Sequence, residues 1–492
     1  MALYEIAPTE PHAMRPGEAV LPDEPSVPLV RVKQIVAAII LAFSAALIFL
    51  AIDGLTMPMR LTLAVFVATI TAWIILGLPD TPVALAGAAA LAALGAVDEE
   101  VVYRSLGNDI VWLMLAAFIL AGVLRQVGVI EQVIGRLLAR LDTVRSLFWG
   151  LTLLIFSTAF VIPSTSARAA VLAPVFLGLS AVIGNVRVVR ALALLFPSVI
   201  LLSAGASLLG AGAHLVAVDM MARTAGQAPD FLGWITLAGP FSLVTTMLAC
   251  AVLLHFFLSA EERSMRIAQP DADSKTVPLT GQQWTVIAVT GIAIALFATQ
   301  PLHGIGMPLV GIAAALVLAN ERVSGLSLKA ALKGVEWNLL LFLAGTLVIG
   351  EALLETGTAG LMAERMVGLL GKGIATWPVV VVGFAAVVAT LSHLVITSRT
   401  ARATVLIPVL ALPLAALGVN PVNLVLVVTL GSGFCQTLMV SAKPVALFGA
   451  VDPPAFGQAD LLRLAAFLLL PFVALLVLSS VLVWPLQGLP LR

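Results

Sequence analysis

The sequence predicts an all-α integral membrane protein with about eleven transmembrane helices and two re-entrant helical hairpins in an inverted-topology repeat. Of its 492 residues, 61% are hydrophobic and 11% are charged, and the mean hydropathy is +1.11. Soluble domains are about 45 to 50% apolar and about 25% charged. The composition therefore argues against a soluble enzyme, a disordered protein and a secreted disulfide scaffold. Recurring apolar runs and an internal repeat are the other two observations behind this prediction.

Apolar runs close to the roughly 20 residues that cross a bilayer recur along the whole chain. They cover residues 34–52, 60–78, 81–97, 110–124, 191–222, 231–258, 283–300, 305–320, 338–354, 422–450 and 461–485. Two further apolar stretches, 146–183 and 376–417, are interrupted midway by Ser, Thr and Arg, which predicts hairpins that enter the membrane partway. Residues 1–33 hold six prolines and no apolar core, so they are predicted to form a disordered cytoplasmic tail without a cleavable signal peptide.

The charges predict an orientation. The chain has 26 basic and 26 acidic side chains, so no net charge attracts it to nucleic acid. With both hairpins treated as re-entrant, sixteen Lys and Arg residues lie on one side, six lie on the other and four lie within the membrane. The positive-inside rule then predicts a cytoplasmic N-terminus. We expect a multi-pass protein of the bacterial inner (plasma) membrane.

An internal repeat is the most specific feature of the sequence. Ser164–Val175 and Ser398–Val409 are identical at 8 of 12 positions. Five predicted spans separate the two hairpins, and because this number is odd, the hairpins enter from opposite faces. Inverted repeats of this kind build secondary transporters, whose substrate sites lie near the membrane midplane.

The repeat divides the chain into segments. Each half has a span, an amphipathic connector, a hairpin and a long Gly-rich apolar segment. The predicted order after the tail is scaffold helices 34–109, repeat 1 over 110–258, a cytoplasmic linker 259–282, scaffold helices and a connector 283–337, and repeat 2 over 338–485. Within the repeats, unwound helix is expected near residues 205–214 and 431–444, where Gly, Ser and basic residues interrupt apolar runs.

These irregular stretches predict an anion site. Unwound backbone at membrane depth is tolerated only where it is buried in protein or lines a wet cavity. The second hairpin arms are expected to begin at Ser166 and Thr400, and helix N-termini carry partial positive charge. Two hairpin tips and two unwound helices can therefore converge on one anion.

The same motifs make the chain resemble the divalent anion:sodium symporter family, within the ion transporter superfamily of elevator-type carriers. That family has Ser-Asn-Thr at each hairpin tip, followed by Ala-Thr-Ala and a proline, and Thr-Pro-Pro-Asn in each unwound helix. The similar positions here are Ser164–Ala169 with Pro174, Ser398–Ala403 with Pro408, Ala211–His214 and Ser441–Pro444. The likeness covers nearly the whole chain.

The resemblance implies an elevator mechanism, a homodimer joined through scaffold spans, and di- or tricarboxylates as the commonest cargo, with sulfate or a sulfonate as further options. In the family, tip Asn residues help to hold sodium, and tip hydroxyls and amides hold substrate carboxylates. Here Thr165 and Arg399 replace both Asn residues. We therefore predict sodium-independent anion exchange. A sodium- or proton-coupled symporter and an anion channel are the alternatives, and a membrane enzyme or receptor is the least favoured.

Ten residues are predicted to bind substrate: Ser164, Thr165, Ser166, Arg168, His214, Ser398, Arg399, Thr400, Arg402 and Lys443. Each has a structural alternative. The hydroxyls can cap helices, Arg168 and Arg402 can pair with a scaffold acid such as Asp219 or Glu351, and a lone His is often a satisfied core residue. The sequence contains no Walker A loop, HExxH pair or C-x-x-C. We expect no enzymatic activity, no metal and no cofactor.

Overall fold

The structure, a computed structural model, describes residues 27–138, 141–267, 278–370, 377–451 and 455–492. These residues form helices joined by turns, and no β-strand occurs within the described ranges. Nine helices in these ranges are long and apolar enough to cross a membrane, and five shorter apolar helices accompany them. The predicted all-α membrane fold is confirmed, while the number of spans and the re-entrance of the hairpins stay predictions.

The first half of the chain runs from α1 to α11. Its helices are α1 (Val27–Ala46), α2 (Met57–Thr71), α3 (Asp80–Ala93), α4 (Glu99–Ser105), α5 (Asp109–Gln126), α6 (Val129–Leu138), α7 (Val144–Ser157), α8 (Thr165–Ile183), α9 (Val186–Ser203), α10 (Gly212–Ala225) and α11 (Phe231–Phe256). Helix α1 begins inside the range predicted as a disordered tail, because the apolar run extends back past Lys33 to Val27. The rest of that tail lies outside the described residues.

The second half repeats this order after a linker. Its helices are α12 (Ala260–Ser264), α13 (Gly281–Ala298), α14 (Gln300–His303), α15 (Met307–Leu318), α16 (Glu321–Ser324), α17 (Leu328–Leu332), α18 (Trp337–Glu355), α19 (Thr358–Leu370), α20 (Pro378–Leu391), α21 (Arg399–Leu406), α22 (Leu412–Ala415), α23 (Pro421–Gly431), α24 (Lys443–Gly449), α25 (Gln458–Leu478) and α26 (Trp484–Leu486). Helices α5 to α11 therefore correspond in order to α18 to α25.

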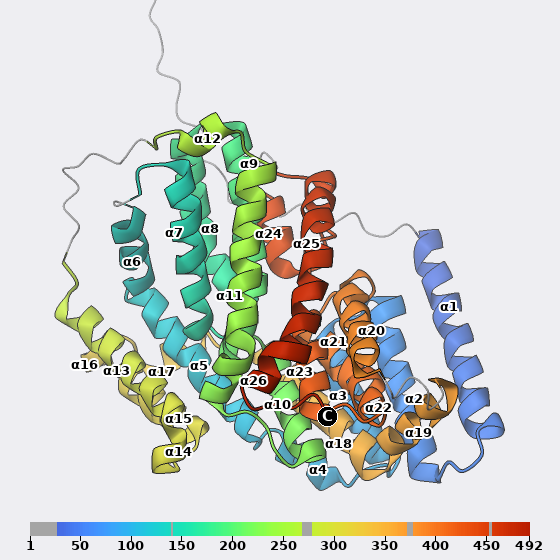
Figure 1. Ribbon diagram of the computed structural model, residues 1–492. Helices are drawn as coiled ribbons and strands as arrows, with labels where there is room; N and C mark the ends of the chain where they lie inside the picture. Colours follow the sequence, from blue (N-terminus) through green and yellow to red (C-terminus); the bar gives the residue numbers. More distant parts are fainter. Residues whose placement is uncertain (1–26, 139–140, 268–277, 371–376, 452–454) are drawn as a thin grey trace, which may run out of the picture.

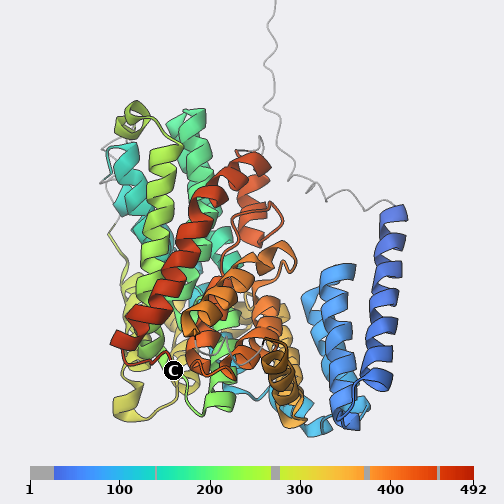
Figure 2. The same ribbon diagram turned by 45° about the vertical axis from the view of Figure 1, so that its right-hand side comes forward.

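The two halves interlock. Helix α3 packs along α18, and α15 packs along α5, so each half lends a helix to the other. Helix α1 stands at the edge of the bundle beside α2 (Figures 1 and 2). Its side chains Ile39 and Phe43 are 62% and 68% exposed, as expected of a helix that faces lipid. Away from α1 and α2, another group of helices packs together (Figure 1): α7, α8, α9, α11, α24 and α25.

Both hairpins turn in the same way. The first arm ends in a 3-10 turn, Thr158–Phe160 in one hairpin and Ser392–Leu394 in the other. After a short turn, Ser164 and Ser398 cap the second arms, α8 and α21. A proline follows in each arm, but only the second hairpin widens there, into a π-turn over Ile407–Ala411 before α22.

Aromatic side chains bind elements of both halves into one body. The ring centroid of Phe176 on α8 lies 5.7 Å from that of Phe196 on α9 and 5.6 Å from that of Phe448 on α24. Trp234 on α11 donates its indole N–H to the carbonyl of Gly205 at 3.0 Å. Helix α8 of the first hairpin thus shares one core with α9, α24 and α11.

Candidate functional site

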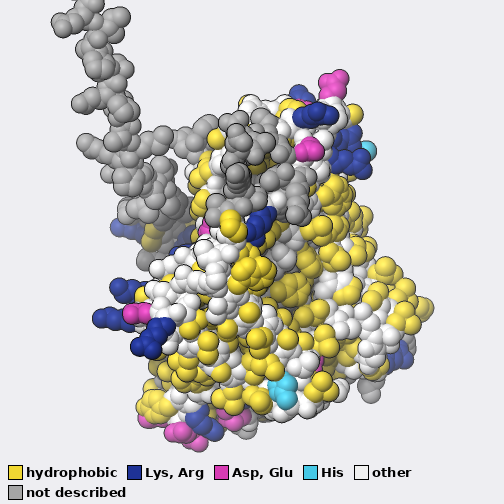
Figure 3. All heavy atoms as spheres, turned by 90° about the vertical axis from the view of Figure 1, so that its left-hand side faces the viewer, with side chains coloured by type: hydrophobic (Ala, Val, Ile, Leu, Met, Phe, Trp, Pro, Cys, Tyr) yellow, Lys and Arg dark blue, Asp and Glu magenta, His cyan; other side chains and the backbone are white. Residues whose placement is uncertain are grey.

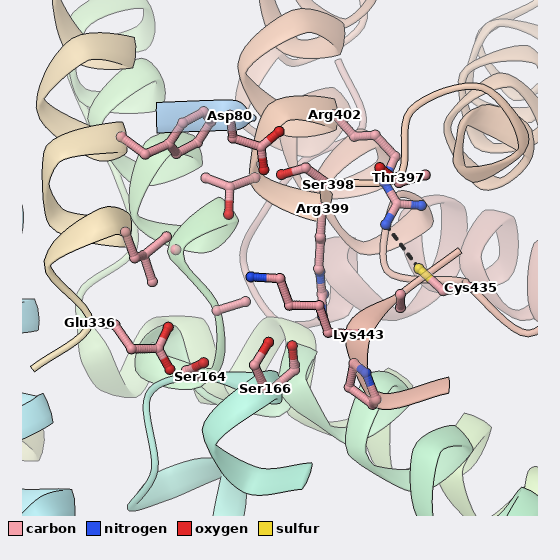
Figure 4. A pocket seen from close by; sticks show the side chains of 18 of the residues that line it. Asp80, Ser164, Ser166, Glu336, Thr397, Ser398, Arg399, Arg402, Cys435 and Lys443 are labelled. Atoms are coloured by element: carbon pink, nitrogen blue, oxygen red, sulfur yellow. Dashed lines mark hydrogen bonds between the residues drawn. The ribbon is translucent and has the colours of Figure 1, made fainter. Parts of the chain in front are cut away.

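A cavity of about 280 Å³ lies where the two hairpin tips meet the breaks that follow them (Figure 4). Eight of the ten predicted site residues line it: Ser164, Thr165, Ser166, Ser398, Arg399, Thr400, Arg402 and Lys443. The wall opposite the tips comes from α3 and α18, and includes Asp80, Thr81, Glu336, Asn338, Leu339 and Phe342. Arg168 and His214, which were also predicted as site residues, do not line this cavity.

The hairpin tips place two helix N-termini at the cavity. The Oγ of Ser164 accepts a hydrogen bond from the backbone N–H of Ala167 at 3.2 Å, and the Oγ of Ser398 accepts one from Ala401 at 3.3 Å. Each cap satisfies one of the four N–H groups that lack an intrahelical partner at a helix start. The other N–H groups give this end partial positive charge. The second arms were predicted to begin at Ser166 and Thr400. Each begins one residue earlier, because Ser164 and Ser398 take the N-cap positions.

The two broken helices re-form with matching geometry. Ala211 precedes α10 with φ −160° and ψ 149°, and Ala442 precedes α24 with φ −159° and ψ 147°. Each break contains a glycine that no other residue could replace without movement. A Cβ on Gly210 would lie 2.1 Å from the carbonyl oxygen of Ala204, and one on Gly433 would lie 2.7 Å from an Arg399 nitrogen. A backbone carbonyl at Gly210 and the Arg399 side chain at Gly433 therefore leave no room for a Cβ, which explains the glycines in these apolar runs.

Arg168 is a fully buried structural cation. Its guanidinium donates to the Thr158 hydroxyl at 2.9 Å, the Ser203 hydroxyl at 2.7 Å, and the carbonyls of Ile155 and Ile200 at 2.5 and 2.8 Å. These groups belong to the first arm of its own hairpin and to α9. Arg168 therefore joins the hairpin to the broken helix and is shielded from the cavity.

Arg402 occupies the equivalent position of the second hairpin but has fewer partners. It donates to the Cys435 sulfur at 2.9 Å and to the Phe434 carbonyl at 3.5 Å. Its Nε has no hydrogen-bond partner among the described residues. Unlike Arg168, it lines the cavity. Its side chain is as fully buried as that of Arg168, but it lies at the wall of the cavity.

Arg399, which lines the cavity, pairs with the buried His214 behind it. One terminal nitrogen of Arg399 lies 3.0 Å from His214 Nε2, and His214 Nδ1 lies 2.9 Å from the carbonyl oxygen of Ser207. A guanidinium can only donate and a carbonyl can only accept, so His214 is neutral with its proton on Nδ1. The imidazole also stacks on Trp234, at 5.0 Å between ring centroids. His214 thus orients Arg399 rather than facing the ligand.

Lys443 brings a third cation to the cavity. It is the first residue of α24, and its ammonium extends into the space between the hairpin tips and the wall that carries Asp80 and Glu336 (Figure 4). None of the ion pairs within the described ranges includes Lys443. The three cations of the cavity come from α21 and α24, whereas the two acids come from the starts of α3 and α18.

His393 belongs to the first arm of the second hairpin. Its Nδ1 lies 2.6 Å from the carbonyl oxygen of Thr390, and its Nε2 lies 2.8 Å from the Thr437 hydroxyl. It is buried outside the cavity. His393 thus ties the hairpin to the break after α23.

Comparison with known proteins decides the family. The model of the citrate transporter family matches residues 66–431 and 294–488, which together cover most of the chain. This chain belongs to the citrate transporter family. That family lies within the ion transporter superfamily, so the resemblance found in the sequence is confirmed. The family and the fold are those of transporters, and the chain is a multi-pass membrane protein.

Relatives of this citrate transporter family member include uncharacterized transporters of Mycobacterium bovis and Mycobacterium tuberculosis. Each is 28% identical over 318 residues, which is 62% of this chain and 70% of the relative. The fold is similar to that of the YdaH transporter of Alcanivorax borkumensis, whose crystal structure is described as having an unusual topology. That match has a TM-score of 0.55 at 18% identity and covers 80% of this chain and 88% of the other.

Sequence reasoning missed the acidic wall of this family member. Asp80 is the first residue of α3 and Glu336 directly precedes α18, and both lie at the ends of apolar runs. Acidic residues at the ends of transmembrane helices commonly lie at the membrane interface, so neither residue was predicted to line the site. The apolar runs that begin near residues 81 and 338 are both predicted to start on the cytoplasmic side. That shared side was the one signal in the sequence that relates Asp80 to Glu336.

Proposed function

We propose that this protein is a secondary carrier of small multivalent anions of the di- or tricarboxylate class, with citrate as the first candidate. The observation that carries the proposal is the convergence of two helix N-termini and three cations, Arg399, Arg402 and Lys443, on one cavity. Its volume of about 280 Å³ is near the lower end of the roughly 300 to 1,000 Å³ typical of ligand pockets. The name of the matched family also supports citrate.

Charge replacement supports exchange without sodium. Arg399 stands where the resembling family has a tip Asn, and Arg402 and Lys443 line the same cavity. Two like charges about 4 Å apart repel by roughly 4 kcal/mol at an effective dielectric of 20. Fixed cations of this strength disfavour a neighbouring sodium ion and take over its role of neutralising the substrate. Unlike bound sodium ions, these fixed cations cannot dissociate from the empty carrier. The carrier therefore returns across the membrane more readily with another anion bound, which favours exchange.

The helix bundle has one part that carries the hairpin tips and another that carries α3 and α18. Movement of the first part along the second would be an elevator movement. The hairpin tips, both breaks and the cations belong to the body that includes α8, α9 and α24, whereas Asp80 and Glu336 belong to α3 and α18. Both scaffold helices begin on the side predicted to be cytoplasmic. The substrate cavity therefore faces the cytoplasmic end of the scaffold, as in an inward-facing carrier.

One ion pair bridges these two parts at the other end of the scaffold helix. Arg223 on α10 lies 2.8 Å from Asp219 on its own helix and 3.3 Å from Glu351 on α18. Movement of α10 along α18 would separate Arg223 from Glu351. These acids, considered in the sequence as partners for Arg168 and Arg402, pair with Arg223 instead.

The remaining expectations on location and assembly belong to this proposal. We place the carrier in a bacterial inner membrane with a cytoplasmic N-terminus, on the distribution of Lys and Arg. We also propose a homodimer joined through scaffold helices, with one substrate site in each protomer. Native mass spectrometry in a mild detergent tests this, and a spectrum of monomers alone would contradict the dimer.

Counterflow in proteoliposomes tests the transport proposal. Vesicles loaded with unlabelled citrate should accumulate radiolabelled citrate, and internal succinate should support less uptake because it engages fewer cations. Internal choline should support none. With the membrane potential held at zero, a channel would dissipate the label gradient without accumulation. A preference for cations or neutral amino acids would contradict the anion site.

A further inference from the structure

A second cavity, of about 740 Å³, lies outside the transport site, between the start of α7, the end of α11 and α12. Six of its lining residues define its character: Arg145, Trp149, Ala251, Leu254, His255 and Arg263. The transport mechanism uses none of them. We call this cavity the α7–α11 groove.

The groove has a basic rim. Arg145 and His255 are exposed, and Arg263 is half-buried. Arg263 donates its Nε to the carbonyl of Ser259 at 3.2 Å, which leaves its terminal nitrogens directed elsewhere. Within residues 141–267, no carboxylate lies at ion-pair distance from Arg145 or Arg263. The rim thus offers two guanidinium groups without an internal counter-charge.

Neither acid of α12 lies at ion-pair distance from the rim arginines. Glu262 turns back to accept a hydrogen bond from the Ser259 backbone N–H at 2.8 Å, as part of the capping box of α12. Glu261 on the same short helix is exposed to solvent and does not line the groove. The groove therefore presents positive charge to a ligand.

An apolar track continues from the rim along the helices. Trp149 and Leu153 follow Arg145 at intervals of four residues, so all three share one face of α7. Leu153 is 54% exposed, and Val244 on the neighbouring α11 is 48% exposed. Basic, acidic and His side chains gather at the top of the molecule above a broad hydrophobic band (Figure 3). The cations thus lie at one end of a lipid-facing surface.

Backbone pairing holds the rim together. The N–H of Val144 donates to the carbonyl of Met265 at 3.0 Å, and the N–H of Ile267 donates to the carbonyl of Asp142 at 3.0 Å. These bonds tie the chain after α12 to the start of α7, so Arg145 and Arg263 are held on joined backbone. The groove is therefore formed before a ligand arrives.

We infer that the α7–α11 groove binds the headgroup phosphate of an anionic phospholipid, with an acyl chain along the apolar track. Basic pockets between transmembrane helices on the cytoplasmic side are suited to such headgroups, and Trp149, one turn along α7 from Arg145, is of the residue type that anchors proteins at the membrane interface. A soluble phosphate compound would use the rim but leave the track unoccupied. The continuity of rim and track favours the lipid.

Native mass spectrometry of the full chain tests this inference, with phosphatidylglycerol and phosphatidylcholine titrated into detergent micelles. Phosphatidylglycerol should bind preferentially, and Arg145→Gln with Arg263→Gln should weaken its binding roughly tenfold. Arg187→Gln is the matched control, because this exposed arginine at the start of α9 lies on the same predicted side but outside the groove. It should bind lipid as the unmutated protein does.

Three outcomes would overturn the inference. Equal binding of phosphatidylcholine would remove the headgroup selectivity, and undiminished binding by the double variant would remove the groove as its site. Glycerol phosphate competing as well as the whole lipid would identify a soluble phosphate ligand instead. Citrate binding by the double variant, measured in parallel, should be unchanged and shows that the protein is folded.

Discussion

The two hairpin tips begin from nearly the same sequence and differ in what their arginines do. Arg168 is enclosed by four hydrogen bonds from its hairpin and α9. Arg402, at the equivalent position, has two contacts, an unpartnered Nε among the described residues, and a place in the cavity wall. An internal repeat therefore preserves the position of a charge without preserving its role.

The partners of the two arginines explain this difference. Thr158 and Ser203 give Arg168 two hydroxyl acceptors, and the α9 carbonyl of Ile200 remains within reach. On the second side, the break after α23 begins at Ser432, and Arg402 meets Phe434 and Cys435 instead. A sulfur and a long carbonyl contact satisfy a guanidinium poorly. We therefore expect stability from the first arginine and substrate binding from the second.

The largest expected effect is on stability, in Arg168→Ala. The change leaves the buried carbonyls of Ile155 and Ile200 without these donors and should destabilise the fold by about 3 kcal/mol or more. Arg168→Lys should not rescue it, because one ammonium cannot span acceptors arranged for a planar fork. Thermal unfolding in detergent measures both variants. Stability equal to that of the unmutated protein would place Arg168 with the ligand instead.

The next largest expected effect is on the affinity for substrate, in Arg402→Ala. Loss of a charged hydrogen-bond donor to a carboxylate costs about 1.5 to 3 kcal/mol, so citrate binding should weaken roughly tenfold or more. Thermal stability without ligand should fall less than in Arg168→Ala. Isothermal titration beside the unfolding measurement separates the two arginines. If both variants lose stability and binding equally, the contrast between the tips is wrong.

Lys443→Met should have an intermediate effect. The substitution keeps the length of the side chain and removes one charge that faces the acidic wall. We expect citrate affinity to fall by roughly tenfold and Lys443→Arg to retain most of it. Binding titrations of both variants test this, and an unchanged affinity in Lys443→Met would remove Lys443 from the site.

The smallest effect concerns the ion pair between the two parts of the bundle. Glu351→Gln removes the scaffold partner of Arg223, and a partly exposed pair contributes about 0 to 1 kcal/mol. The cavity should then face the cytoplasm less often. Labelling of Thr81→Cys from that side by an impermeant maleimide should slow, whereas Asp219→Asn should leave it unchanged. Faster labelling in Glu351→Gln would contradict the proposed direction of movement.

The sequence predicted the tips, the breaks and all three cavity cations, because these depend on local signals. Serines at helix starts, glycines within apolar runs and charges within spans are readable without tertiary contacts. The separate fates of Arg168 and Arg402 were not predictable, since their partners are mainly backbone carbonyls and a thiol that only packing brings near. Asp80 and Glu336 escaped notice because only the fold brings the starts of α3 and α18 to the hairpin tips.

The central claim is that fixed cations, and not sodium, balance the anion in this cavity. Counterflow of radiolabelled citrate into citrate-loaded vesicles tests it most directly, with sodium replaced by potassium on both sides. We expect equal rates in the two salts for the unmutated protein and strongly reduced uptake for Arg402→Ala. A steep dependence on sodium, or full uptake by Arg402→Ala, would contradict it.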